Sequence, residues 1–215
     1  MTRLQDVRAQ FERHAALWNQ QRGYHLEDSL LDSAAGVAQS NSHPHVALDI
    51  AELTKLAHSG DVDAQVFLAA RIAREAPDQA MHWLEEAAIH SNYTAPLIMM
   101  SNLRLIQAQA QAGSQPPQSK PVFDEAMAWR VVAATRHDYY AQALLDEKGE
   151  ALGDLDPAQQ QRIRNQAAKL RADLDAKRLA AGHSAYNDTR LPPPAEALLT
   201  QARQLNQQLE DLGDD

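Results

Sequence analysis

Apolar residues recur at helical spacing near both ends of the chain, with polar residues between them. The two stripes consist of Leu4, Val7, Phe11, Ala15 and Trp18, and of Leu198, Ala202, Leu205, Leu209 and Leu212. Intervals of three and four residues place such side chains on one face of a helix. The pattern therefore predicts an amphipathic helix at each end, the last one over 195–212.

Helix breaks divide the region between these two stripes. Asp156-Pro157 is a typical helix start, because Asp accepts hydrogen bonds from the first amides and Pro fits the first turn. Pro-rich segments at 113–121 and 191–194 predict loops, and a Ser-, Asn- and His-rich break is expected at 36–44. Since β-branched residues are few, the sequence predicts an all-α fold.

An internal repeat is the strongest pattern in the chain. Asp, Ala, Met, Trp and an Ala pair occur at the same spacing in 78–88 and in 124–134. On a helix, Ala80, Trp83 and Ala87 share one face, so that the indole packs between small residues against a neighbouring helix. The equivalent set is Ala126, Trp129 and Ala133. A packing role predicts that Trp83→Ala costs about 3–5 kcal/mol in a thermal melt.

Around these two segments the chain resembles a known repeat family. The residues that carry the resemblance are Gly60-Asp61-Val62-Asp63-Ala64-Gln65, Ala80 to Ala88, Ala126 to Trp129 with Ala133-Ala134, and Ala141-Gln142. Over 53–178 the chain resembles the Sel1-like repeats, relatives of the tetratricopeptide repeats. The Gly pair that usually separates the two helices of a repeat is replaced by 74–77 in the first repeat and by the Pro-rich insertion in the second.

The resemblance implies a fold and a mode of action. Antiparallel helix pairs, each with an A and a B helix, would stack into a right-handed α-solenoid, with Ala64 in the repeat core and the A helices lining a concave groove that holds a partner protein. The family is frequent among bacterial adaptors and scaffolds, which are often exported. A periplasmic location is therefore the alternative to a cytoplasmic one.

Three segments are expected along the chain. Residues 1–42 form an N-terminal helical cap, 43–181 form the Sel1-like repeats with the insertion at 113–121, and 182–215 form a Pro-rich spacer and the C-terminal amphipathic helix. This last helix either caps the open end of the solenoid or pairs with a second copy, giving a homodimer through 195–215.

Charge and composition exclude several classes of partner. The net charge of −9 repels phosphate backbones, so that no nucleic-acid partner is expected. The chain has no cysteine, which excludes thiol catalysis and thiolate metal sites. No apolar run approaches the length of a membrane span, so no membrane insertion is expected. The N-terminal residues lack an apolar signal segment, which favours a cytoplasmic protein.

Candidate partner-binding residues follow from aligning the A helices. The alignment places Arg71, Asn102 and Lys148 at one equivalent position, and Arg74 lies one turn beyond Arg71. Tyr139 and Tyr140, in the polar and aromatic cluster at 137–140, are expected at the surface or in the groove where the third A helix begins. An acidic or extended peptide would suit a groove with two arginines.

No catalytic or metal-binding pattern stands out. The chain contains no nucleophile elbow and no Gly-rich phosphate loop. His43 and His45 with His58, or His82 with Glu85 and His90, lack the spacing of a metal site, so no metal and no cofactor are expected. The sequence favours a noncatalytic protein-interaction scaffold or adaptor. An oligomerising assembly factor that uses the C-terminal helix is the alternative, and a small enzyme or a metal-binding protein ranks below both.

Overall fold

Helices make up the regular structure of this protein. The computed structural model describes residues 18–26, 43–113, 116–146 and 152–186, and no strand occurs within these ranges. The α-helices are α3 (Ile50–His58), α4 (Val62–Ile72), α5 (Pro77–His90), α6 (Ala95–Ala112), α7 (Pro121–Thr135), α8 (Tyr139–Asp146) and α9 (Pro157–Ala180). Four short 3-10 turns lie between them, η1 (Tyr24–Leu26), η2 (Pro44–Ala47), η3 (Pro117–Ser119) and η4 (Leu152–Asp154). The predicted all-α class is confirmed.

The helices begin where the sequence supplies a cap. Asp49, Asp61 and Asp156 each accept a hydrogen bond from an amide in the first turn of α3, α4 and α9. Proline stands in the first turn of α5, α6, α7 and α9. The predicted start at Asp156-Pro157 is confirmed, and Ile163, Ala167 and Leu174 on α9 are buried as expected.

One predicted loop is partly helical. In the Pro-rich segment 113–121, Pro117–Ser119 form a 3-10 turn and Pro121 opens α7. The prediction that this whole segment is non-helical is therefore wrong at its end, because proline is compatible with the first helical turn. The terminal helices predicted over 4–18 and 195–212 and the loop at 191–194 lie outside the described residues, apart from a helical stretch at 18–22.

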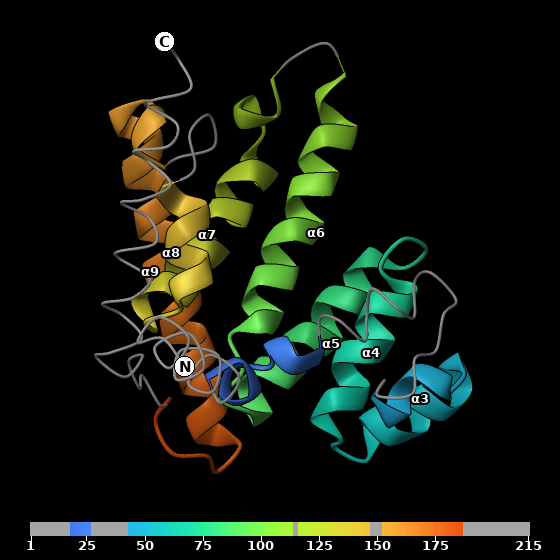
Figure 1. Ribbon diagram of the computed structural model, residues 1–215. Helices are drawn as coiled ribbons and strands as arrows, with labels where there is room; N and C mark the ends of the chain where they lie inside the picture. The colour runs from blue at the N-terminus through green and yellow to red at the C-terminus, as the bar shows by residue number, and fades with distance from the viewer. Residues whose placement is uncertain (1–17, 27–42, 114–115, 147–151, 187–215) are drawn as a thin grey trace, which may run out of the picture.

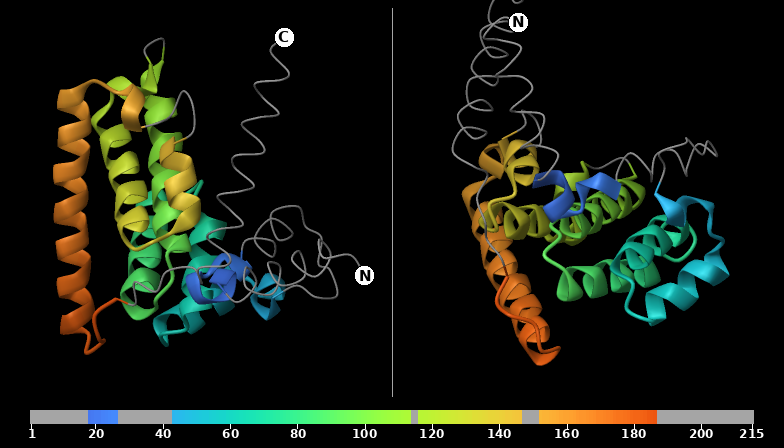
Figure 2. Two further views of the ribbon diagram at one scale, coloured as in Figure 1. Left: turned by 60° about the vertical axis from the view of Figure 1, so that its left-hand side comes forward. Right: turned by 60° about the horizontal axis from the view of Figure 1, so that its bottom comes forward.

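Neighbouring helices pack as antiparallel pairs around α7. The closest pairs are α6 with α7 and α4 with α5, and α7 also packs against α8 and α9 (Figure 1). Helix α9 runs beside α7 and reaches α5 near its own C-terminal end (Figure 2). The core forms two clusters, one around α6, α7 and α9 and one around α3 and α4, and Trp83 packs against both.

The third helix pair differs from the first two. In the first two pairs, α4 packs closely on α5 and α6 on α7, whereas α8 packs on α7 and barely meets α9. The fold thus contains packed antiparallel pairs, while the regular solenoid remains a prediction.

Candidate functional site

The predicted partner-binding residues lie on separate elements. Arg71 on α4 donates a hydrogen bond to the carbonyl oxygen of Val46 at 2.7 Å, and thus holds η2 against α4. Arg74 is exposed beyond the end of α4, Asn102 is exposed on α6, and Lys148 lies outside the described residues. Helices α4, α6 and α8 pack mainly on α5 and α7, and the expected groove along these A helices remains a prediction.

The two predicted tyrosines flank a turn whose aspartate is buried. Tyr139 is partly buried, and Tyr140 is 43% exposed with its ring edge against Tyr24. Asp138, just before them, is only 1% exposed. The expectation that the 137–140 cluster lies at the surface is therefore wrong for Asp138, since its carboxylate joins several segments in the interior.

The predicted repeat core is buried, with one difference between its two tryptophans. The alanines of this core have no exposed surface, namely Ala64, Ala80, Ala87, Ala126 and Ala133. Trp129 is 4% exposed, whereas Trp83 is only partly buried. The two copies of the motif therefore occupy different surroundings.

An open groove lies over the exposed edge of Trp83, and we call it the Trp83 groove. It has a volume of about 540 Å³ and lies between α3, α4 and α5. Its lining residues are Ile50, Thr54, His58, Leu68, Ile72, Asp78, Gln79, His82 and Trp83. Ile50 is 47% exposed, and the ring of His58 stands edge-on to Trp83 with centroids 5.0 Å apart. The groove combines an aromatic and aliphatic floor with a polar edge.

The same motif positions are covered on α7 and open on α5. Asp124 accepts hydrogen bonds from the Gln159 amide at 2.7 Å and from Nε of Arg162 at 3.2 Å, both on α9. Its side chain is 12% exposed, whereas the side chain of the equivalent Asp78 is 93% exposed. Ala128 is fully buried, while the equivalent His82 is exposed. Helix α9 covers this face of α7, and the matching face of α5 borders the Trp83 groove.

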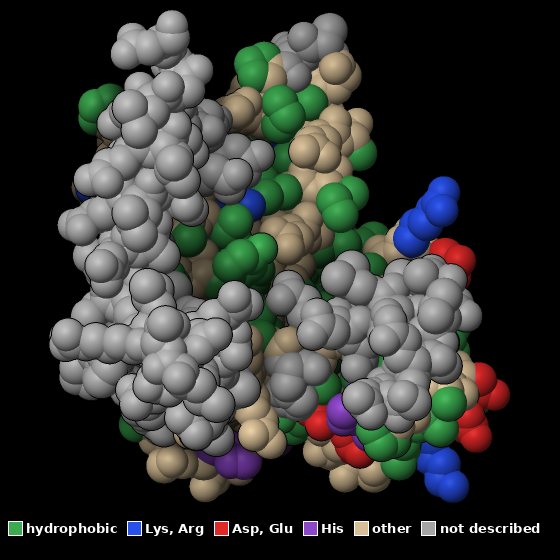
Figure 3. Space-filling view, viewed as in Figure 1, with side chains coloured by type: hydrophobic (Ala, Val, Ile, Leu, Met, Phe, Trp, Pro, Cys, Tyr) green, Lys and Arg blue, Asp and Glu red, His purple; other side chains and the backbone are tan. Residues whose placement is uncertain are grey.

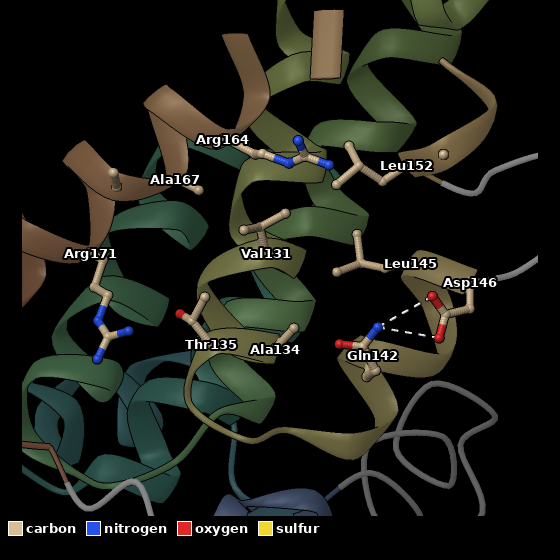
Figure 4. A pocket seen from close by; sticks show the side chains of 12 residues that line it. Val131, Ala134, Thr135, Gln142, Leu145, Asp146, Leu152, Arg164, Ala167 and Arg171 are labelled. Atoms are coloured by element: carbon tan, nitrogen blue, oxygen red, sulfur yellow. Dashed lines mark hydrogen bonds between the residues drawn. The ribbon is translucent and has the colours of Figure 1, made fainter. Parts of the chain in front are cut away.

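A second groove lies where α8 and α9 fail to meet, and we call it the α8–α9 groove. It has a volume of about 680 Å³ and is closed on one side by α7 (Figure 4). Its apolar lining includes Val131, Ala134, Leu145, Leu152, Ala167 and Ala168. Arg164 and Arg171 line the α9 side, and Gln142 donates to both carboxylate oxygens of Asp146 at 3.2 Å. The groove is apolar at its centre and carries two guanidiniums along α9, of which that of Arg171 lies 3.7 Å from Asp175, while Asp146 lines the α8 side.

A buried polar junction joins the turns at one end of the helices. Asp138 accepts hydrogen bonds from the Tyr24 hydroxyl at 3.0 Å, from the Ala141 amide at 2.8 Å and from the Thr94 hydroxyl. Burial raises the pKa of Asp138, although these hydrogen bonds and the charge of Arg22 act in the opposite direction. Because the acceptors on this carboxylate already bind three segments of the chain, its role is structural.

Two buried arginines extend this junction to α9. Arg178 donates to the carbonyl oxygens of Ile89, at 2.8 Å, and Ser91, which lie at the C-terminal end of α5. Arg136 donates to Asp175 at 2.6 Å, and its guanidinium lies 3.5 Å from the ring centre of Tyr186. The Tyr186 hydroxyl donates to the carbonyl oxygen of Tyr93, and burial raises the pKa of Tyr186. The chain is thus anchored at Tyr186.

The histidines of the two rejected metal groupings do not converge on one point, although the rings of His43 and His45 are in contact. His43 and His45 contact Asp63 and Asp61 at 3.3 Å and 3.1 Å, whereas His58 lies against Trp83. His90 contacts Glu86 and His183 rather than joining His82. Within the described ranges, no group of three or more His, Cys, Asp or Glu residues could hold a metal ion.

Sequence analysis missed the two grooves, because both depend on which helices meet. Asp78 and Asp124 hold the same position in the two copies of the motif. A shared motif cannot show that a later helix covers only one of these two aspartates. The buried role of Asp138 had a usable signal, since His137-Asp138 before Ala141-Gln142 repeats Gly60-Asp61 before Ala64-Gln65. In both turns the aspartate caps the next helix by accepting from the buried alanine, at 2.9 Å for Asp61 and 2.8 Å for Asp138.

Comparison with known proteins gives no match to a family model, to a curated protein or to a solved structure. The resemblance to Sel1-like repeats thus remains a prediction from the sequence. Among the helices that the structure describes, none is both long enough and apolar enough to span a membrane.

Proposed function

We propose that this protein is a noncatalytic interaction scaffold that holds a helix of a partner protein in the Trp83 groove. The observation that carries the proposal is the contrast between Asp124, which α9 covers, and Asp78, which is 93% exposed at the edge of an apolar groove. Both motif helices carry an aspartate and a tryptophan at equivalent positions, but α9 covers the aspartate of α7 only, while α5 meets α4, α6 and the end of α9 elsewhere on its surface. The face of α5 around Asp78 is therefore open. The contact between α9 and the equivalent face of α7 indicates what kind of helix could cover it.

The packing of α9 on α7 indicates the chemistry of such a partner. Gln159 and Arg162 supply an amide and a cation to Asp124, and the small Ala128 lies buried on the same face. A partner helix with a basic residue at Asp78 and large apolar side chains for the groove would complete the equivalent interface. Arg104 forms a long ion pair with Asp78 at 3.9 Å and a shorter one with Glu125 at 2.8 Å, so Asp78 is only weakly paired within the chain.

This surface favours a basic partner helix over the acidic peptide expected from Arg71 and Arg74. Arg71 donates to the carbonyl oxygen of Val46, so part of its guanidinium is engaged in holding η2. The buried carboxyl of Asp138 has a structural role in this assignment. Its oxygens are used in holding Tyr24, Thr94 and the start of α8 together.

Affinity capture from the native host tests this function. The parent protein is compared with Asp78→Lys and with Asp173→Lys, which makes the same charge change at an exposed position of α9. We expect a partner that is recovered with the parent and the control and lost with Asp78→Lys, while circular dichroism shows that all three are folded. A photo-crosslinker at Gln79 should then join a basic helix of that partner.

Two outcomes would contradict the proposal. Equal recovery with Asp78→Lys would show that this surface does not bind the partner. Loss on Arg74→Glu, with Asp78→Lys unaffected, would instead support the acidic-peptide hypothesis.

A further inference from the structure

We propose that the α8–α9 groove is the docking site of the chain's own C-terminal segment, 195–212, which binds there as an amphipathic helix. The groove is distinct from the Trp83 groove, so this inference does not depend on the proposed function. It rests on the shape and lining of the groove, on where the chain leaves the described structure, and on the charge and pattern of the segment.

The groove has the character of an incomplete helix–helix interface. In the first two pairs the two helices bury their apolar faces against each other, but α8 and α9 are held apart while both pack on α7. The space between them is lined by Val131, Leu145 and Leu152 and by the small residues Ala167 and Ala168. Small residues on one wall allow the backbone of an inserted helix to approach closely.

The chain leaves the described structure beside this groove. Tyr186 is held by the Tyr93 carbonyl and by Arg136, and Arg136 directly follows Thr135, which lines the groove. The eight residues 187–194 can extend over about 25 Å. Tyr186 lies beside Arg178, with 5.3 Å between the guanidinium and the ring centre, and Arg164 at the far end of the groove is about 21 Å from Arg178 along α9. The spacer is therefore long enough to carry the following segment into the groove.

The segment and the groove are complementary in charge and in polarity. Leu198, Ala202, Leu205, Leu209 and Leu212 form its apolar stripe. The segment 195–212 carries one cation, Arg203, and three acidic residues, Glu196, Glu210 and Asp211, and Asp214 and Asp215 follow it. The groove presents an apolar centre and the guanidiniums of Arg164 and Arg171. Figure 4 shows Arg164 reaching from α9 toward Leu152 at the open side.

Paramagnetic relaxation enhancement in the full-length chain tests the docking. Because the chain has no cysteine, Gln207→Cys provides a single attachment point for a nitroxide on the face opposite the leucine stripe. We expect loss of the methyl signals of Val131, Leu145 and Leu152, with little effect on Leu68 and Ile72 in the Trp83 groove.

Matched variants separate docking from a general effect of charge. Leu205→Asp with Leu209→Asp should restore the lost methyl signals, whereas Thr200→Asp with Gln204→Asp, which add the same charge off the stripe, should not. Arg164→Glu should restore part of the signal, while Lys169→Glu, at another exposed position of α9, should leave the broadening unchanged.

Three results would overturn the proposal. The first is the absence of selective broadening in the groove. The second is broadening that persists in the stripe variant. The third is equally strong broadening in isotope-enriched chains that carry no nitroxide, when they are mixed with nitroxide-labelled chains, because the occupant would then be a second copy of the protein.

Discussion

Helices α5 and α7 carry the same sequence motif and differ in what lies against them. Helix α7 packs against α6, α8 and α9, and its Asp124, Ala128 and Trp129 are buried. Helix α5 has the equivalent residues Asp78, His82 and Trp83, and all three reach the surface to some degree. The motif therefore defines the packing against the preceding helix, while the opposite face depends on which later helix returns to cover it.

The exposed and covered copies also differ in composition in a way that matches their surroundings. Where α9 covers α7, the motif has Ala128, and where α5 is open, it has the polar His82. An alanine permits close helix approach, whereas a histidine is easily hydrated. Figure 3 shows hydrophobic side chains in the middle of one face of the molecule.

The largest expected difference between the two copies concerns their tryptophans. Trp129→Ala should reduce the free energy of unfolding by about 3–5 kcal/mol, because it leaves a cavity in the core. Trp83→Ala should cost clearly less than this, and less than the same value expected from the sequence alone, since part of its ring already contacts solvent in the Trp83 groove. Chemical denaturation of both variants measures the difference. Equal losses at the two positions would show that the surroundings of the two copies are energetically the same.

The pH dependence of Asp138 is the next largest effect. Burial raises the pKa of Asp138 above its ordinary value of 3.8, so the folded state disfavours the ionised carboxyl. Its contribution to stability is fully present below that value and is lost as the pH rises through the pKa of the folded state. Asp138→Asn should lose about 1–3 kcal/mol near acidic pH through mismatched hydrogen bonds, and the loss should shrink as the pH rises.

Thermal melts of the parent and Asp138→Asn across this pH range measure the change. A difference in melting temperature that stays constant with pH, or that grows as the pH rises, would contradict the raised pKa of Asp138.

The aspartates of the two motif copies should also differ in their contribution to stability, by less than the two tryptophans do. Asp124→Ala removes the acceptor of Gln159 and Arg162 and should cost about 1–2 kcal/mol, a value reduced by the exposure of Arg162. Asp78→Ala should change stability by less than about 0.5 kcal/mol, because its side chain is exposed. Urea unfolding of the two variants tests this. A loss at Asp78 as large as that at Asp124 would mean that Asp78 has a structural role.

Sequence analysis predicted the elements better than their assembly. The Asp156-Pro157 start, the buried alanines and the turn at 74–77 depend on local chemistry, which a sequence displays directly. The gap between α8 and α9 and the approach of α9 to α5 depend on competition among distant surfaces. Arg71 shows the same limit, since only the fold reveals that its partner is the carbonyl oxygen of Val46.

The turns that precede α4 and α8 repeat one backbone geometry with different residues, and substitutions there should have small effects on stability. Gly60 and His137 both have positive φ, 90° and 57°, and each is followed by the aspartate that caps the next helix. Glycine adopts this left-handed conformation without the steric cost that a histidine bears. His137→Gly should therefore stabilise the protein by about 0.5–1 kcal/mol, and Gly60→Ala should destabilise it by a similar amount. His137→Ala serves as the control and should give no gain, since alanine keeps the steric cost. Differential scanning calorimetry measures all three, and a loss of stability in His137→Gly would show that the imidazole contributes more to this turn than its backbone strain costs.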